Sequence, residues 1–516
     1  MPNAIRPVQA LKVTGAQRVA FCFVSLVMSV WCAGVIPARA QDQENLANFA
    51  RIASAQPAPT ERVSLATVAP GLLTYFNNGP VFGIGGTAGG NFWQRTQLTG
   101  DWNGARTNWT DHGFFLDIYS TSTYQNVTDG GLKTGSAFAQ NTQLSLNIDT
   151  ARAGWWSGGL FHFTVQSRYG SSPENTFTVG SYVPQYTGFV EPGALLSQDT
   201  WPSEYFLTQA VAKKFSVVLG VISDVFIPDE TLFGNSYKFY FANFNLNKNP
   251  MTTNFYQPTA IAALGVWTPT PSVIVAGGGL DPFTRANTFE DAFHTGLNLY
   301  VTAVVSYALR GRPGQVSPSF NWSNQAQIDF ESPFGPLSRA QVPDAVGALL
   351  GGPTAGLPVN FKRSSSFTIA NASQYLYLKE TEASEVKKKM KNAEPLRGVG
   401  VFGRAGYAPK TTNTLTWDGS VALLARGLWD SRQDDSFGVG YYYNAVSGEL
   451  KDSIGQLTGG TNVENEKGFE VFYDFALTPA LRIIPSYQYV WNPLVAQVAA
   501  GHRSASVFLL RLTAVL

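Results

Sequence analysis

Hydrophobic and polar residues alternate along most of the chain, from about residue 111 to the carboxyl terminus. In GFFLDIYSTSTY (113–124), Phe114 and Leu116 fall on one side of the backbone, while Asp117 and Tyr119 fall on the other. Three more stretches repeat the pattern clearly, at 160–169, 468–475 and 481–491. An alternation with a period of two residues is typical of a β-strand with one apolar and one polar face. We therefore expect an all-β protein.

The alternating segments are about sixteen in number and are separated by Gly, Pro, Asn and Asp. We expect them to begin near residues 113, 136, 159, 204, 214, 260, 271, 296, 316, 366, 398, 414, 436, 467, 480 and 504. Some connections are tight, as at 269–271 and 478–480, whereas 170–203, 224–259, 332–364 and 446–466 are long. Short periplasmic turns opposite long extracellular loops characterise a transmembrane antiparallel β-barrel of the outer membrane, which is the fold we predict.

Aromatic residues support this fold without excluding another. Trp417, Trp429, the run Tyr441–Tyr443 and Trp491 fall near predicted strand ends, where a barrel places its interfacial aromatic girdles. The final segment, VFLLRLTAVL, alternates as a closing strand would, although it ends in Leu516 where such strands usually end in Phe. A soluble secreted β-rich protein that binds glycans could also bury these aromatic side chains, and this alternative stays open.

The amino terminus has the features of an export signal. An uncharged apolar run at 19–36 follows Arg6, Lys12 and Arg18 and precedes Ala38-Arg39-Ala40, an A-x-A cleavage pattern. We interpret residues 1–40 as a cleaved signal peptide, with an N-terminal membrane anchor as the alternative. Residues 41–97 then form a periplasmic extension or linker, and residues 98–516 form the barrel. No later apolar run is long enough for a membrane-spanning helix.

Composition excludes several kinds of chemistry. Removing residues 1–40 takes away four basic and no acidic residues, which leaves 32 basic against 35 acidic residues and a net charge of −3. Both cysteines, Cys22 and Cys32, lie in the predicted signal, so the mature chain has no disulfide and no thiolate ligand. The four histidines have no metal-ligand spacing. We predict no metal, no cofactor and no nucleic-acid partner.

The chain also contains a G-x-G-x-x-G pattern at 398–403, which in another context would indicate a dinucleotide site. Such a site needs a helix after the third glycine, and Gly406 and Pro409 disfavour one. We interpret this stretch as a strand whose glycine-rich lumen face stays open and carries Arg404. An outer-membrane enzyme would need a set of catalytic residues. His162 with a nearby serine is the only candidate pair, and it matches no recognisable motif. We predict no catalytic residues.

Four stretches resemble the carbohydrate-selective porin family of the OprB type. They are LTGDWNGART (98–107), VFGRAGYAPKTTNTLTWDGSVAL (401–423), DSFGVGYYYN (435–444) and GFEVFYDFALTPALRIIPSYQYVWNP (468–493). The resemblance spans about 98–516 and does not extend to 41–97 or to the charged stretch 379–395. It implies a sixteen-stranded barrel in the bacterial outer membrane, surrounded by lipid and lipopolysaccharide, through which small sugars diffuse passively. It also favours a monomer over a trimer.

Candidate pore-lining residues come from one long loop and from charges within strands. The segment 223–250 mixes Asp224, Asp229, Glu230 and Lys238 with aromatic residues, and it either folds into the lumen or lies on the surface. Charges in mid-strand should face the lumen, because an arginine facing lipid costs about 2–4 kcal/mol at the midplane. These residues are Asp117, Arg168, Arg404, Asp418, Arg426, Glu470, Asp474 and Arg482.

Each of these charges could contact a solute or could be an ordinary wall charge away from the constriction. Arg106 is a similar candidate, with a structural tie at the periplasmic rim as its alternative. As a set, charges of mixed sign suit a neutral solute better than an ion of one sign, so we predict a sugar-selective porin. A general porin, or one for organic solutes, on the same barrel remains the alternative.

Overall fold

The computed structural model describes residues 89–516, apart from 171–176, 184–199, 223–237, 255–258, 283–291, 387–395 and the single positions 271, 295 and 383. The predicted signal peptide, most of the predicted extension, and the candidates Asp224, Asp229 and Glu230 lie outside the described residues. Within the described part of the chain, no helix combines the length and apolar character needed to cross a bilayer.

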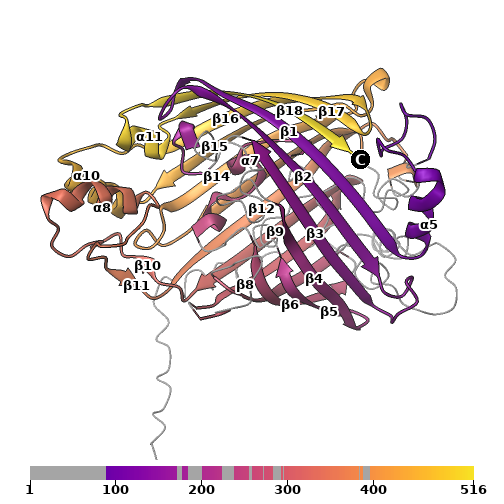
Figure 1. Cartoon of the computed structure of the whole chain (residues 1–516), viewed down its shortest axis with the longest axis horizontal. Helices are drawn as coiled ribbons and strands as arrows, with labels where there is room; N and C mark the ends of the chain where they lie inside the picture. Colours follow the sequence, from indigo (N-terminus) through magenta and orange to yellow (C-terminus); the bar gives the residue numbers. More distant parts are fainter. Residues whose placement is uncertain are drawn as a thin grey trace, which may run out of the picture. The chain divides into compact units, whose positions relative to one another are not determined.

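Sixteen strands form one closed antiparallel barrel, in which every neighbour in the chain is a neighbour in the sheet (Figure 1). The barrel closes where β1 pairs with β18, as at Ser120 and Ala514. The strands are β1 (Phe114–Gly130), β2 (Gly135–Asp149), β3 (Gly159–Gly170), β4 (Thr200–Ala212), β5 (Phe215–Ile222), β6 (Ala260–Thr270), β7 (Val273–Leu280), β8 (Asn298–Leu309), β9 (Arg312–Ser323), β12 (Ser365–Leu378), β13 (Gly398–Tyr407), β14 (Leu415–Arg426), β15 (Ser436–Val446), β16 (Glu466–Thr478), β17 (Leu481–Trp491) and β18 (Ser504–Val515).

The period-two pattern places the strands because each strand separates two environments. In β18, Phe508, Leu510 and Leu512 are exposed on the outer face of the barrel, whereas Leu509 and Arg511 are fully buried on the inner face. The predicted barrel of about sixteen strands is confirmed, and no predicted start lies more than four residues from the observed one. The G-x-G-x-x-G stretch is β13, a strand as predicted.

The two ends of the barrel differ in their connections. Two-residue links join β4 to β5, β8 to β9 and β16 to β17, at the same end as the carboxyl terminus and the helix α5 (Ala105–Asp111). We call this the short-turn end. The four connections predicted to be long, between β3 and β4, β5 and β6, β9 and β12, and β15 and β16, all lie at the opposite, long-loop end.

The connection from β12 to β13, residues 379–397, is an exception to this asymmetry, because it is long and lies at the short-turn end. Its two described edges are tied to the next turn. Lys379 Nζ and Arg397 Nη2 each lie 2.7 Å from Asp430 Oδ1. These hydrogen bonds, first from Lys379 and then from Arg397, hold the pKa of Asp430 below its ordinary value. The turn between β14 and β15 is thereby fastened to its neighbour.

The long-loop end carries small structured elements that the strand pattern did not predict. The helices α8 (Val342–Leu349) and α10 (Gly448–Thr458) pack against each other beside the pair β10 (Gln327–Ile328) and β11 (Phe361–Lys362) (Figure 1). Leu349, Leu450, Ile454 and Phe330 form their shared apolar core. A third helix, α11 (Leu494–Ala499), joins β17 to β18.

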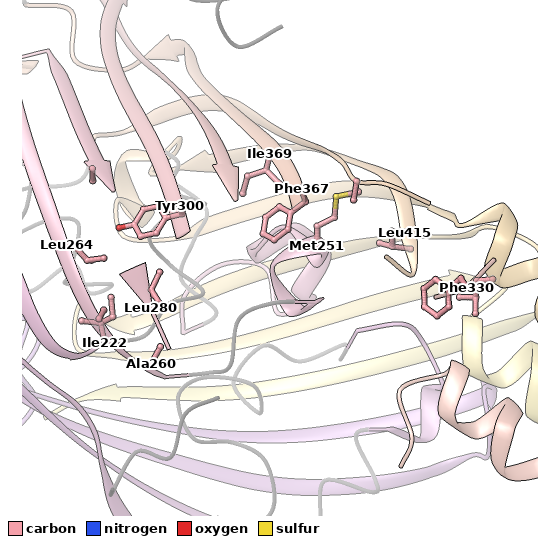
Figure 2. Packing of buried hydrophobic residues seen from close by; sticks show 14 of the residues in the cluster. Ile222, Met251, Ala260, Leu264, Leu280, Tyr300, Phe330, Phe367, Ile369 and Leu415 are labelled. Carbon is pink, nitrogen blue, oxygen red and sulfur yellow. The ribbon is translucent and has the colours of Figure 1, made fainter. Parts of the chain in front are cut away.

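The inner wall of the barrel is chemically uneven. On β5 to β7, inward positions are largely aliphatic, and Ile222, Leu264 and Leu280 are at most 4% exposed. Figure 2 shows these side chains with Tyr300 in one apolar cluster that continues to Phe367 of β12. We call the inner faces of β5 to β7 the apolar wall. A hydroxyl-rich solute gains nothing from this surface, so the polar parts of the lumen decide how a solute passes.

Candidate solute pathway

The segment 238–254 lies inside the barrel. It contains the short helix α7 (Phe244–Asn247) and the 3-10 turn η4 (Pro250–Asn254), and Asn243 caps α7 by accepting from the backbone N–H of Asn245 at 3.0 Å. Phe241, Phe244 and Leu246 are completely buried. Of the two alternatives for the loop after β5, the described half takes the inward one. We call residues 238–254 the inward segment.

Charged side chains of the barrel hold the backbone of the inward segment. Glu470 of β16 accepts the backbone N–H groups of Ala242 and Asn243, at 3.0 and 2.8 Å. Arg404 of β13 donates to the carbonyl oxygen of Leu246 at 2.9 Å, and Arg511 of β18 donates to that of Tyr240 at 2.7 Å. Hydrogen bonds with one charged partner are the strong ones. These contacts fix the segment against the wall formed by β13 to β18.

Side-chain amides add further contacts along the same wall. Asn249 Nδ2 donates to Asp418 Oδ1 at 3.0 Å, and Asn243 Nδ2 donates to Gln488 Oε1 at 3.1 Å. Asn444 Nδ2 donates to Asn245 at 2.9 Å. The asparagines of FANFNLNKNP therefore pair with inward-facing polar residues of β14, β15 and β17.

Glycines on β13 and β15 provide space for the inward segment. A Cβ atom on Gly440 would lie 2.8 Å from Leu246, and one on Gly438 would lie 2.7 Å from the ring of Phe241. A Cβ atom on Gly406 would lie 2.8 Å from Met251. The expectation that the lumen face of β13 stays open was therefore wrong: the glycines there leave room for packed protein.

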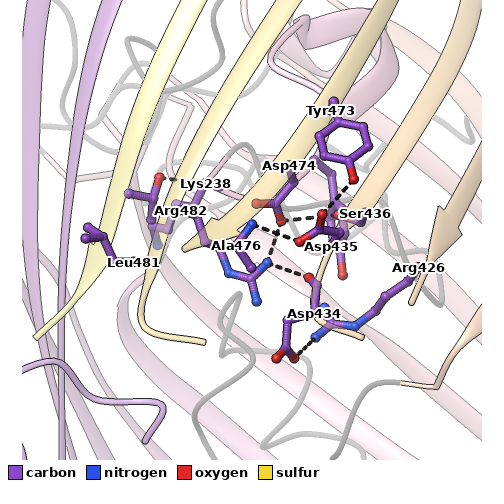
Figure 3. Close-up of polar contacts among 12 residues, drawn as sticks. Lys238, Arg426, Asp434, Asp435, Ser436, Tyr473, Asp474, Ala476, Leu481 and Arg482 are labelled. Atoms are coloured by element: carbon purple, nitrogen blue, oxygen red, sulfur yellow. Dashed lines mark hydrogen bonds and ion pairs between the residues drawn. The ribbon is translucent and has the colours of Figure 1, made fainter. Parts of the chain in front are cut away.

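Several candidate charges thus have protein partners. Arg404, Asp418 and Glu470 face the lumen as predicted and bind the inward segment. Nearer the short-turn end, Arg482 Nη1 and Asp474 Oδ2 form a buried ion pair at 2.6 Å (Figure 3). In the same cluster, Arg482 also donates to the carbonyl oxygen of Asp434 at 2.9 Å, and Arg426 lies 3.5 Å from the Asp434 carboxylate.

Arg106 has the contacts of a structural tie. Its guanidinium donates to the carbonyl oxygens of Gly100 and Leu516, at 3.1 and 2.9 Å, and lies over the Trp102 ring. The last residue of the chain is thereby fixed to the segment before β1. This geometry favours the alternative considered for Arg106, a tie at the rim.

The remaining described candidates are Asp117, Arg168 and Lys238, on or next to the strands that follow β18 around the barrel. The carbonyl oxygen of Lys238 accepts from Thr513 of β18, and its Nζ lies over the ring of Tyr119 of β1 and donates to Gln143 Oε1 of β2 at 2.6 Å. Asp117 of β1 and Arg168 of β3 are buried on the inner face. The Asp117 carboxylate has one oxygen without a hydrogen-bond partner in the described structure.

Uncharged polar residues, which the search for charges passed over, complete this side. His162 of β3 bonds Asn147 Oδ1 at 2.7 Å through Nδ1 and Thr164 Oγ1 at 2.8 Å through Nε2. Gln166 is the cross-strand partner of both Gln143 and Trp201. We call the inward faces of β1 to β4 the polar wall; its members are Asp117, Gln143, Ser145, Asn147, His162, Thr164, Gln166, Arg168, Trp201 and Glu204. The alternation that located the strands could have identified all of them except Trp201, which an irregularity in the register between β3 and β4 brings to the same face as Glu204.

No group of three or more potential metal ligands occurs among the residues that the structure describes. A closed barrel of sixteen strands, with a segment folded into a partly polar lumen, defines a pore-forming protein of the outer membrane, that is, a porin. Residues 133–513 match the carbohydrate-selective porin, OprB family, and the chain belongs to that family. Its function is therefore carbohydrate-selective transport across the outer membrane, and it is not an enzyme.

The first of three similar solved structures supports the fold. The high-pH structure of Pseudomonas putida OprB is 17% identical, with a TM-score of 0.67 over 83% of this chain and 100% of that one. Its low-pH structure is 15% identical with a TM-score of 0.48, over 82% and 99% of the two chains. Pseudomonas aeruginosa OccK11 (OpdR) is 10% identical with a TM-score of 0.40, over 78% and 96%. No curated protein matches the sequence.

Proposed function

We propose that small neutral sugars pass between the inward segment and the polar wall, and that the contact of Lys238 with Gln143 marks the narrowest point. That contact is the observation that carries the proposal, because it is where the side chain of Lys238 extends from the inward segment to the polar wall. The inward segment packs on β13 to β18, and β5 to β7 present mostly aliphatic side chains. Polar groups line the inner faces of β8, β9 and β12 as well as the polar wall, and the polar wall is the one that Lys238 contacts.

The groups at this point suit sugar hydroxyls. Lys238 is a donor, the free oxygen of Asp117 is an acceptor, and the side chain of Gln166 offers both a donor and an acceptor without a partner in the described structure. Trp201, beside Gln166 in the register, adds an aromatic face for the apolar side of a sugar ring. A sugar would replace Gln143 as the acceptor of the Lys238 ammonium and return it on leaving. Weak, exchangeable contacts of this kind allow a solute to leave as readily as it enters.

The test compares the wild-type protein with Lys238→Ala and Gln143→Ala in planar bilayers. We expect open wild-type pores whose ion conductance falls when glucose is added, and less reduction at the same glucose concentration in both variants. Lys362→Ala is the matched control, because this lysine of β11 pairs with Asp329, away from the barrel wall. If both lumen variants respond to glucose as the wild type does, the proposed path is wrong. Wild-type pores insensitive to every monosaccharide would instead favour an organic-solute porin.

We also propose that residues 1–40 are removed on export and that the mature porin is a monomer in the outer membrane. The apolar run and A-x-A pattern support the first point, and the family resemblance supports the second. The intact mass of the purified outer-membrane protein and its mass in detergent by light scattering test both. A chain that begins at Gln41, in particles of one copy, is expected. A retained amino terminus or a trimer would contradict the respective proposal.

A further inference from the structure

A buried histidine lies within the polar wall. His162 of β3 is at most 4% exposed and stacks on Phe206 of β4, with ring centroids 4.7 Å apart. Its Nδ1 meets an amide oxygen of Asn147, and its Nε2 meets the hydroxyl of Thr164. The Nε2 atom also lies 3.7 Å from the carboxylate of Glu204. Each ring nitrogen therefore has an oxygen partner that can accept a hydrogen bond from it when the nitrogen carries a proton.

This arrangement accommodates the charged imidazolium as readily as the neutral ring. A protonated histidine donates from both nitrogens, and oxygen atoms of Asn147, Thr164 and Glu204 are placed to receive those protons. The hydroxyl of Thr164 is in turn 2.9 Å from that of Ser145, so it can reorient within the wall. Histidine is the side chain whose ordinary titration falls between pH 5 and 8.

Charged groups face His162 from several elements. Glu204 lies on β4, and the Asp117 carboxylate on β1 interacts electrostatically with His162, with Lys238 of the inward segment and with Arg106 of α5. The facing residues of β2, Ser145 and Asn147, carry no charge. With Arg168 of β3, these charges are two acidic against three basic. Protonation of His162 adds one further positive charge to the polar wall.

We propose that His162 sets the preference of this pore between neutral and carboxylated sugars, by charging the polar wall as the pH falls. The inference rests on the proposed path along that wall. While His162 is neutral it adds no charge to the wall, and a neutral sugar is favoured. At pH 5 the added charge admits anions, including carboxylated sugars such as gluconate. A unit charge about 7 Å from a singly charged solute, with water between, changes the entry of that solute about threefold.

The experiment measures the reversal potential of bilayers that contain one protein variant at a time, in a KCl gradient at pH 8 and at pH 5. The wild type is expected to raise its chloride-to-potassium permeability ratio about threefold on acidification. His162→Gln and His162→Asn keep hydrogen-bonding capacity without a titrating ring, and both should show less than half of that change. His502→Gln is the control, because His502 lies in the connection between β17 and β18 and bonds the backbone of Gly131.

Each outcome has a defined meaning. Loss of the change in both His162 variants, with the wild-type change kept in His502→Gln, supports the proposal. An unchanged wild-type ratio, a change that persists without His162, or one that disappears without His502 overturns it. Migration on heating shows whether each variant forms a barrel. The fall in wild-type conductance on addition of sugar at pH 8 is measured separately. If conductance does not fall, the proposed sugar path is rejected, and the permeability ratio still decides the role of His162.

Discussion

Removing the Glu470 carboxylate should release the inward segment without opening the barrel. This fully buried side chain accepts two backbone N–H groups, from Ala242 and Asn243. Hydrogen bonds to a charged group contribute roughly 1.5–3 kcal/mol each, so Glu470→Ala should weaken the seating of the segment by about 3–6 kcal/mol. At the lower limit the ratio of seated to released segment changes more than a hundredfold, since 1.4 kcal/mol is a factor of about ten.

The assay is single-channel conductance in planar bilayers, with and without glucose. Glu470→Ala should give larger, noisier conductance and weaker reduction by glucose, because the segment no longer narrows the lumen. Glu470→Gln keeps one acceptor oxygen and should be intermediate. Glu449→Ala is the control, because Glu449 only pairs with Lys410 at the long-loop end, where such pairs contribute about 0–1 kcal/mol. Wild-type conductance and sugar response in a correctly folded Glu470→Ala protein would refute the anchoring role.

Two further predictions concern packing and closure. Gly440→Val places atoms where Leu246 lies and should raise conductance by displacing the inward segment. Gly419→Ala should not raise it, because a Cβ atom there would lie 3.9 Å from its nearest neighbour. Equal conductance of the two variants would contradict the packing argument. Arg106→Ala loses the bonds to Gly100 and Leu516 and should reduce stability by about 2 kcal/mol, measured as a lower temperature of heat-modified migration. Arg152→Ala, a substitution of an exposed arginine, is the control and should leave that temperature unchanged. An Arg106→Ala protein as heat-resistant as the wild type would show that Arg106 is not a structural tie.

The barrel could be predicted from sequence because lipid and lumen impose a period of two on every strand. Phe508, Leu510 and Leu512 on one side and Leu509 and Arg511 on the other follow this rule without regard to any distant contact. The turn at 379–397 could not be placed by loop length. The side of the membrane on which this connection lies follows only from counting the strands before it. The assumption that long connections are extracellular fails for this one. The helix α10 had local signals, an N-cap at Ser447 and a left-handed Gly459, which the search for strands overlooked.

The site was harder to predict because its contacts are distant in sequence. That Arg404 faces inward follows from the alternation in β13, but its partner Leu246 is 158 residues away. Whether the loop after β5 enters the lumen depends on space at Gly438 and Gly440 and on acceptors such as Glu470, none of which is visible from the loop itself. A search limited to charges also omitted Gln143, Gln166 and His162. A lumen for neutral solutes relies on such uncharged polar groups as much as on charges.

The proposed path can be tested directly with single cysteines, since both cysteines of the chain precede residue 41. Gln166→Cys places a thiol on the polar wall, and Leu264→Cys places one on the apolar wall. A charged, membrane-impermeant thiol reagent added to open pores should reduce the conductance of Gln166→Cys and leave that of Leu264→Cys unchanged. Modification of Leu264→Cys with no effect on Gln166→Cys would contradict the path along the polar wall.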